Sequence, residues 1–100
     1  MAHRLAPQAV EDLDSIWFYV ATESGSIEAA NRLIDSLTLR FLLLAQHPYM
    51  GRVRDEDFGP GSRSFAVGEY VVLYRVEEPN VLILRVVHGH RDLAAWFFES

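Results

Sequence analysis

The side chains best suited to binding or to acid–base chemistry gather in the second half of the chain. They are cationic or imidazole groups: Arg63, Arg85, His88, His90 and Arg91. Arginine can bind a carboxylate or a phosphate through two parallel hydrogen bonds, and histidine can exchange protons near neutral pH. Cleavage of RNA by its own 2′-hydroxyl would need a general base, a general acid and cations within hydrogen-bonding reach. These residue types therefore allow two interpretations, a nuclease site or a cationic surface that binds a partner.

The two histidines at His88 and His90 invite a metal-site hypothesis, because they are two residues apart at the end of an extended run. A metal site needs three or four ligands with oriented supporting groups. The chain has no cysteine, and His3 and His47 are not positioned by the sequence to complete a site. We expect neither a metal nor a cofactor, and interpret the pair as the hydrogen-bonded end of a strand.

The arginines leave a structural alternative open. Arg85 lies inside the apolar run V-L-I-L-R-V-V, where an unpaired charge would be costly. We therefore expect it to pair with an acid or to lie at a partner surface. For Arg63, Arg85 and Arg91, partner binding and structural ion pairing both remain open.

Charge argues against a protein that binds nucleic acid directly. The formal net charge is −5, and all nine basic residues are arginine. A domain that binds mainly by neutralising phosphates is expected to be basic overall. The acids concentrate at 11–14 and 55–57 and the arginines from position 52 onward, so a local basic face remains possible.

Length and composition predict one compact domain over residues 1–100, because 100 residues, half of them apolar, supply one modest core. No apolar run approaches the length of a membrane span, and the N-terminus lacks the apolar region of a signal peptide. We expect a cytoplasmic protein with no membrane partner.

Two helices are expected in the first half, over about residues 7–23 and 27–46. Apolar residues recur there at three- and four-residue spacing, which is typical of helices with one buried stripe. Gly25 suits the end of the first helix and Ser26 the cap of the second. Additional leucines near the end of the second helix indicate deeper burial there or a surface that binds a partner.

Three strands are expected at 62–67, 70–76 and 81–88, joined as an antiparallel meander, with a short extended segment at 2–6 and a final helix at about 92–98. Residues 49–61 have turn composition. The predicted fold is α+β in the order β-α-α-β-β-β with a short C-terminal helix, in which the N-terminal strand and the helical hairpin pack on a small antiparallel sheet. That final helix carries three aromatic residues, which either dock as core or face a partner.

Hairpin registers of Val67 with Tyr70 and Val76 with Val81 sort the strand residues onto two faces. One face then carries Arg63, Phe65, Val72, Tyr74, Ile83 and Arg85. The other carries Ala66, Val71, Leu73, Arg75, Leu82, Leu84, Val86 and His88. Both faces are largely apolar, so the sequence leaves open which one the helices cover.

The second half also contains an ordered series of short motifs: P-Y-M-G-R-V-R, G-S-R-S-F, E-Y-V-V-L-Y-R-V and I-L-R-V-V-H-G-H-R-D. Following two helices in a chain of this length, the series resembles the ParE-like toxins of the ParE/RelE toxin–antitoxin superfamily. The resemblance implies the toxin of a type II toxin–antitoxin pair that inhibits DNA gyrase by protein–protein contact.

The RelE-like branch of the superfamily comprises ribosome-dependent mRNA endonucleases, which use Lys, Arg, His, Glu and Tyr side chains. This chain keeps Arg63 and Arg91 but has Phe65, Val71 and Phe97 where that branch often places ionisable or hydrogen-bonding groups. We therefore expect no catalytic residues and no enzyme. A RelE-like nuclease using His88 or His90 remains the alternative.

The resemblance also implies a cognate ParD-like antitoxin in a toxin–antitoxin hetero-oligomer, with a C-terminal arm that folds along the helices. The residues expected to bind that arm are Trp17, Phe18, Leu39 and Leu42. The residues expected to contact gyrase are Arg63, Arg85, His88, His90 and Arg91.

Overall fold

The computed structural model of the protein describes residues 1–89. Its elements are, in order, β1 (Ala2–Leu5), α1 (Pro7–Ser24), α2 (Ile27–Gln46), β2 (Arg52–Val53), α3 (Asp55–Phe58), β3 (Ser62–Val67), β4 (Tyr70–Glu77) and β5 (Asn80–His88). Both long helices and the three meander strands lie within a residue of their predicted bounds. The helix expected at 92–98 lies outside the described residues.

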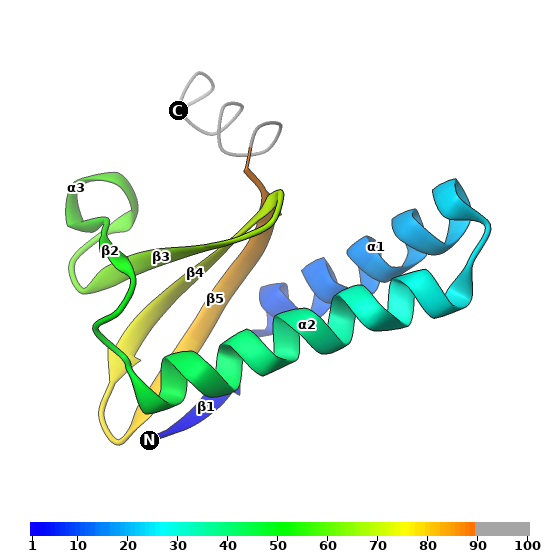
Figure 1. The fold of residues 1–100 in the computed structure, drawn as a ribbon. Helices are drawn as coiled ribbons and strands as arrows, with labels where there is room; N and C mark the ends of the chain where they lie inside the picture. Colours follow the sequence, from blue (N-terminus) through cyan, green and yellow to red (C-terminus); the bar gives the residue numbers. More distant parts are fainter. Residues whose placement is uncertain (90–100) are drawn as a thin grey trace.

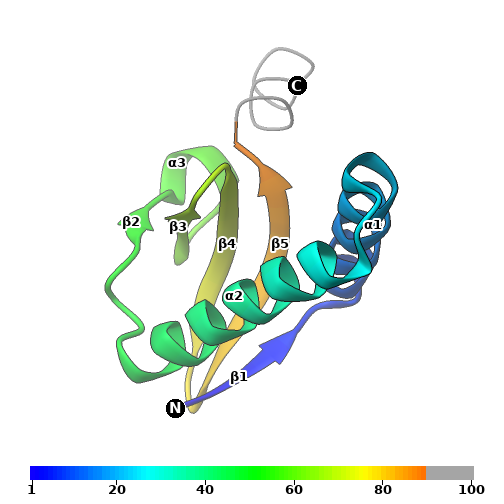
Figure 2. The ribbon, with the colours of Figure 1, turned by 45° about the vertical axis from the view of Figure 1, so that its right-hand side comes forward.

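The strands form one five-stranded sheet in the order β1-β5-β4-β3-β2, and the hairpin of α1 and α2 covers one of its faces (Figures 1 and 2). The predicted α+β fold is therefore confirmed. Two features add to it. Strand β1 joins the sheet and runs parallel to β5, so the sheet is mixed. Within the segment expected to be only turns, β2 pairs with β3 and α3 follows.

The helix boundaries follow from local chemistry. Gly25 ends α1 at a φ of 67°, in the left-handed region that glycine enters without a side-chain clash. The Ser26 hydroxyl accepts a hydrogen bond of 3.1 Å from the Ala29 amide and caps α2. The hairpin tip extends beyond the sheet (Figure 1).

A bulge in β5 changes the predicted face assignment. Val67 pairs with Tyr70 and Val76 with Val81, as expected, but Tyr74 pairs with Ile83 while Leu73 pairs with Arg85. Leu84 is thus an extra residue, and side chains after it alternate in the opposite sense.

The predicted faces of three β5 residues were therefore wrong. Val86 pairs with Val72 and His88 with Tyr70, so both share the face that the helices cover, and Arg85 moves to the other face beside Leu73. One inserted residue produces this change, because side-chain direction alternates with a period of two.

The core lies between the helical hairpin and this covered face. Its members are buried and mostly aliphatic: Ala9, Leu37, Phe41, Leu44, Val67, Val72, Tyr74, Val81, Ile83 and Val86. Burying a large apolar side chain contributes roughly 1.5–3 kcal/mol before entropy is counted. The two helical stripes predicted from the sequence are thus the surfaces that meet the sheet.

Tyr74 connects the loop after α2 to the centre of the sheet. Its ring is fully buried, and its hydroxyl donates to the Pro48 carbonyl at 2.9 Å and accepts from the Gly51 amide at 2.8 Å. Burial raises the pKa of Tyr74 above its ordinary value of 10.0, although the Gly51 hydrogen bond and the nearby Arg63 charge oppose the shift. The hydroxyl therefore keeps its proton, and its bond to Pro48, at neutral pH.

We expect Tyr74→Phe to lower the free energy of unfolding by about 1–3 kcal/mol, because it leaves the buried Gly51 amide and the Pro48 carbonyl without their shared partner. Denaturant titration followed by circular dichroism measures the change. Tyr49→Phe is the matched control, since the Tyr49 side chain is exposed and its loss of a hydroxyl should cost less than about 0.5 kcal/mol. Equal stability of the two variants would contradict this role for Tyr74.

Candidate functional site

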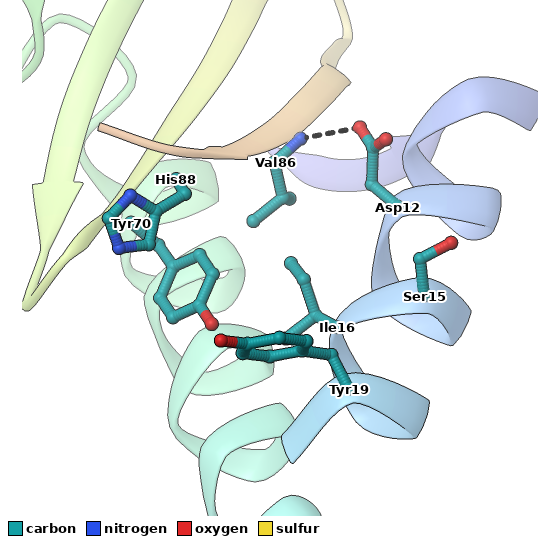
Figure 3. A pocket seen from close by; sticks show the side chains of 7 residues that line it. All are labelled: Asp12, Ser15, Ile16, Tyr19, Tyr70, Val86 and His88. Atoms are coloured by element: carbon teal, nitrogen blue, oxygen red, sulfur yellow. Dashed lines mark hydrogen bonds between the residues drawn. The ribbon is translucent and has the colours of Figure 1, made fainter. Parts of the chain in front are cut away.

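Asp12 of α1 joins the helical hairpin to β5. Its carboxylate accepts hydrogen bonds from Arg85 Nε at 2.7 Å, from Arg85 Nη2 at 3.0 Å and from the Val86 amide at 2.9 Å. Figure 3 shows the bond to Val86. The pairing of β1 with β5 ends at Leu5 and Ile83, so beyond that point the outward amide of β5 needs another acceptor. Asp12 supplies it.

The expectation that Arg85 pairs with an acid is confirmed. The guanidinium uses two of its nitrogens on one carboxylate, the geometry in which an arginine–carboxylate pair is strongest. About a third of the Arg85 side chain, 32%, remains exposed. Arg85 is therefore a structural residue that also reaches the surface.

A cavity of 310 Å³ lies beside this pair, between α1 and the ends of β4 and β5. Its lining consists of Asp12, Ser15, Ile16, Tyr19, Tyr70, Val86 and His88. In Figure 3 the hydroxyls of Tyr19 and Tyr70 point toward one another across the cavity.

His88 closes one side of the cavity. Its ring meets the Tyr70 ring edge to face, with 5.6 Å between centroids, and its Nε2 lies 3.7 Å from the Glu69 carboxylate. The Glu69 side chain is 80% exposed. The cavity thus combines aromatic walls and hydroxyl groups with the carboxylate of Asp12.

Arg63 lies far from this cavity. Arg63, in β3, pairs with Tyr74 of β4, whereas His88, in β5, pairs with Tyr70 of β4. Tyr74 and Tyr70 are four residues apart, or about 13 Å along the strand. The Arg63 Nη1 donates to the carbonyls of Tyr49 and Gly51 at 3.1 and 2.8 Å, and its guanidinium carbon lies 5.2 Å from the centre of the Tyr49 ring. The structure therefore does not bring Arg63 together with Arg85 and His88.

The residues predicted to bind an antitoxin lie on the helical hairpin. Phe18, Leu39 and Leu42 are 68%, 65% and 48% exposed. Of the two interpretations of the additional leucines in α2, deeper burial is therefore wrong for Leu39 and Leu42. Trp17 differs, because it is partly buried and its Nε1 donates to Asn31 Oδ1 at 2.8 Å, linking α1 to α2.

Of the seven residues that line the cavity, sequence reasoning had predicted only His88 as a site residue, and it missed the polar side chains of Asp12, Ser15, Tyr19 and Tyr70. A signal was present, since Asp12, Ser15 and Tyr19 recur at three- and four-residue spacing and therefore share one side of α1. His90 and Arg91, which were also predicted to contact the target, lie outside the described residues.

Within residues 1–89, no three histidine or acidic side chains lie close enough together to hold a metal ion. None of the helices in that part of the chain is long and apolar enough to cross a membrane.

The fold is shared with chains of two solved toxin–antitoxin assemblies. It matches a chain of the chromosomal ParDE TA system from P. aeruginosa with a TM-score of 0.76 at 23% identity, covering 88% of this chain and 95% of that one. It also matches a chain of the toxin–antitoxin complex RelBE2 from Mycobacterium tuberculosis with a TM-score of 0.63 at 24% identity, covering 87% and 95%.

The sequence relatives are more specific. The family described as "ParE toxin of type II toxin-antitoxin system, parDE" matches residues 4–93. Toxin ParE1 of Caulobacter vibrioides is 40% identical over 93 residues, covering 93% of this chain and 94% of the relative. Toxin ParE3 of that organism is 36% identical (84% and 82% covered), and its Toxin RelE3 is 34% identical (85% and 90% covered). The chain belongs to the ParE toxin family of type II toxin–antitoxin systems.

We expect Asp12→Ala to lower the free energy of unfolding by about 2–3 kcal/mol, because it removes the acceptor of both Arg85 nitrogens and of the Val86 amide. Chemical denaturation measures the loss. Asp14→Ala is the control, since Asp14 is exposed on the same helix and should cost less than about 0.5 kcal/mol. If Asp12→Ala unfolds at the same denaturant concentration as Asp14→Ala, Asp12 does not join α1 to β5 as described.

Proposed function

We propose that this ParE-family toxin inhibits DNA gyrase by protein–protein contact in the cytoplasm and is neutralised by a ParD-like antitoxin. The observation that carries the proposal is the placement of hydrocarbon where RNA-cleaving members of the superfamily often place reactive groups. Phe65 packs against the core cluster. Val71 packs close to Gly89, since its Cγ2 would lie 3.3 Å from a β-carbon added to that glycine. Neither position offers a proton donor or a cation.

The contacts of three arginines, Arg54, Arg63 and Arg85, also argue against a phosphate-binding centre built from them. Arg54 donates to Ser64 and pairs with Asp57, and Arg63 binds two backbone carbonyls. Arg85 is bound to Asp12. Each of these guanidinium groups would have to give up protein contacts before it could stabilise a phosphorane.

The surface proposed for the antitoxin is the outer side of the helical hairpin. Exposed apolar side chains from both helices, Phe18, Leu39 and Leu42, offer the kind of surface that an amphipathic arm covers when it folds on binding. Trp17 lies at the junction of the two helices and would support that surface from below.

We expect the double substitution Leu39→Asp with Leu42→Asp to weaken antitoxin binding by about 2 kcal/mol or more, because an interface core tolerates no unpaired charge. Isothermal titration calorimetry with the antitoxin encoded beside the toxin gene measures the change. Arg32→Asp and Glu28→Asp, on exposed positions of the same helix, make the control pair. Unchanged affinity of the leucine variant would place the antitoxin elsewhere.

The proposed gyrase contacts are Arg63, Arg85, His88, His90 and Arg91. Since Arg63 and Arg85 also hold the fold together, Arg91 is the cleaner residue to test. We expect Arg91→Ala to raise the toxin concentration needed to block supercoiling by purified gyrase by about tenfold, with an unchanged melting temperature. Arg52→Ala, in the exposed strand β2, should inhibit as the parent does. Full inhibition by Arg91→Ala would remove Arg91 from the contact, and no inhibition by the parent protein would refute gyrase as the target.

The second candidate function is that of a RelE-like, ribosome-dependent mRNA endonuclease. The 34% identity to Toxin RelE3 is the observation that favours it. Purified protein added to translating ribosomes distinguishes the two functions. The gyrase proposal predicts intact messages, whereas cleavage in the ribosomal A site would establish the nuclease.

A further inference from the structure

The outer side of the helical hairpin, which is turned away from the sheet (Figures 1 and 2), presents both apolar and acidic side chains. On α1, Val10, Asp14 and Phe18 are spaced by four residues and therefore form one row along the helix surface. All three side chains are exposed, Val10 to 44% and Phe18 to 68%. Asp14 thus lies between two exposed apolar side chains, each about 6 Å away along the helix axis.

Helix α2 contributes a second row of the same kind. Asp35, Leu39 and Leu42 are spaced by four and three residues, so they also share one side of their helix. All three side chains are exposed. Each helix of the hairpin therefore places one carboxylate next to exposed hydrocarbon.

The two carboxylates lie at about the same level of the hairpin. The hydrogen bond from Trp17 to Asn31 shows how α1 and α2 are aligned. Because the helices run in opposite directions (Figure 1), a step of three residues back from Trp17 and a step of four residues forward from Asn31 lead the same way. These steps end at Asp14 and Asp35, roughly 4.5 and 6 Å along the axes, so the two acids lie across from each other.

These two carboxylates have no partner in the part of the chain that the structure describes. Within residues 1–89, the side chains of Asp14 and Asp35 accept no hydrogen bond and join no ion pair. Arg32 is three residues before Asp35, yet no ion pair connects them. A partner that covered the surface without cations would bury unpaired charges, which is costly. Any stable partner of this surface must therefore bring positive charge to it.

Charge also excludes the other kinds of partner. The two helices contain six acids and two arginines, a formal charge of −4. Two copies of this chain that met through this surface would bring carboxylates against carboxylates, and like charges placed together weaken an interface. Nucleic acid and anionic lipid would be repelled for the same reason. The remaining partner is a cationic polypeptide with apolar side chains of its own.

The geometry of the surface suits a helix. Two helices side by side form a groove in which a third helix packs, with apolar anchors spaced by three, four and seven positions. Val10 and Phe18 are eight residues apart, or about two helical turns, so one such helix can contact both while a cation between its anchors reaches Asp14. We infer that the outer side of the hairpin binds a cationic amphipathic helix, and that Asp14 and Asp35 select the arginine or lysine residues beside its apolar ones.

The inference specifies the chemistry of the segment that the proposed function assigns to an antitoxin. It rests on that proposal only for which protein carries the segment. The requirement for positive charge rests on the exposed apolar side chains and the two unpaired acids of the hairpin.

The test uses the complete toxin and two fluorescently labelled peptides. One is a designed helix with leucines on one face and two arginines beside them, and the other has glutamate in place of both arginines. Anisotropy titrations should show that the arginine peptide binds at least about tenfold more tightly. Its binding should shift the NMR signals of the Asp14, Phe18, Asp35 and Leu39 amides in the isotopically labelled toxin.

A charge reversal separates recognition by these acids from general attraction. Asp14→Lys combined with Asp35→Lys should invert the order, so that the glutamate peptide binds about tenfold more tightly. Glu56→Lys combined with Glu78→Lys changes the net charge equally at exposed positions outside the hairpin, and should leave the preference for arginine within about twofold of the parent's. Lysine is a better helix former than aspartate, so the hairpin variant should fold, which melting curves check.

A milder variant gives a second readout. Asp14→Asn combined with Asp35→Asn removes both charges without adding new ones, and should bring the affinities of the two peptides within about threefold of each other. Persistence of the parent's preference in this variant would contradict the role of the two acids.

Equal affinity of the parent toxin for the two peptides, or an unchanged order after charge reversal, would overturn the inference. Dimerisation of the toxin through this surface, seen as a sedimentation coefficient that rises with concentration while peptide binding is lost, would overturn the choice of partner. The antitoxin titration with the Leu39 and Leu42 variant is a separate measurement. If that variant binds the antitoxin normally while the peptides follow the expected order, only the placement of the antitoxin fails. If it loses the antitoxin while the peptides show no charge preference, only this inference fails.

Discussion

The arrangement of the helical hairpin on the sheet depends on the carboxylate of Asp12. Strand β1 pairs with only the first part of the β5 edge. Beyond the end of β1, the Asp12 carboxylate accepts the hydrogen bond of the outward Val86 amide. The same carboxylate neutralises Arg85, which the bulge at Leu84 turns toward the opposite face. One side chain thus satisfies the open edge of β5 and the partly exposed Arg85 charge together, and it links α1 to β5 beside the cavity.

A second set of polar contacts holds the other end of the molecule. Tyr74 and Arg63 both bind backbone groups of residues 48–51, so the chain leaving α2 is attached to β3 and β4 before it enters β2. Arg54 and Arg85 are likewise engaged by side chains of the protein itself, Arg54 by Ser64 and Asp57 and Arg85 by Asp12.

Much of the fold was predictable because its signals are local. The stripes at 7–23 and 27–46, the glycine at position 25, the serine cap at 26 and the hairpin registers at Val67 and Val76 each depend on a few neighbouring residues. The candidate site was only partly predictable. The acid partner of Arg85 was expected but not identified, because 73 residues separate Asp12 from it. The separation of Arg63 from His88 likewise follows from pairing across strands and has no local signature.

By itself, the sequence determined the helices, the meander, the apolar stripes and the resemblance to ParE-like toxins, since spacing, turn chemistry and ordered motifs carry that information directly. Only the tertiary structure decided which sheet face the helices cover, that β1 runs parallel to β5, and that Tyr19, Tyr70 and His88 share one cavity. The physical reason is the extra residue at Leu84. A bulge is set by how well distant side chains pack and pair, and it reverses every later side chain of the strand, so no local pattern could place Val86 and His88 beneath α1.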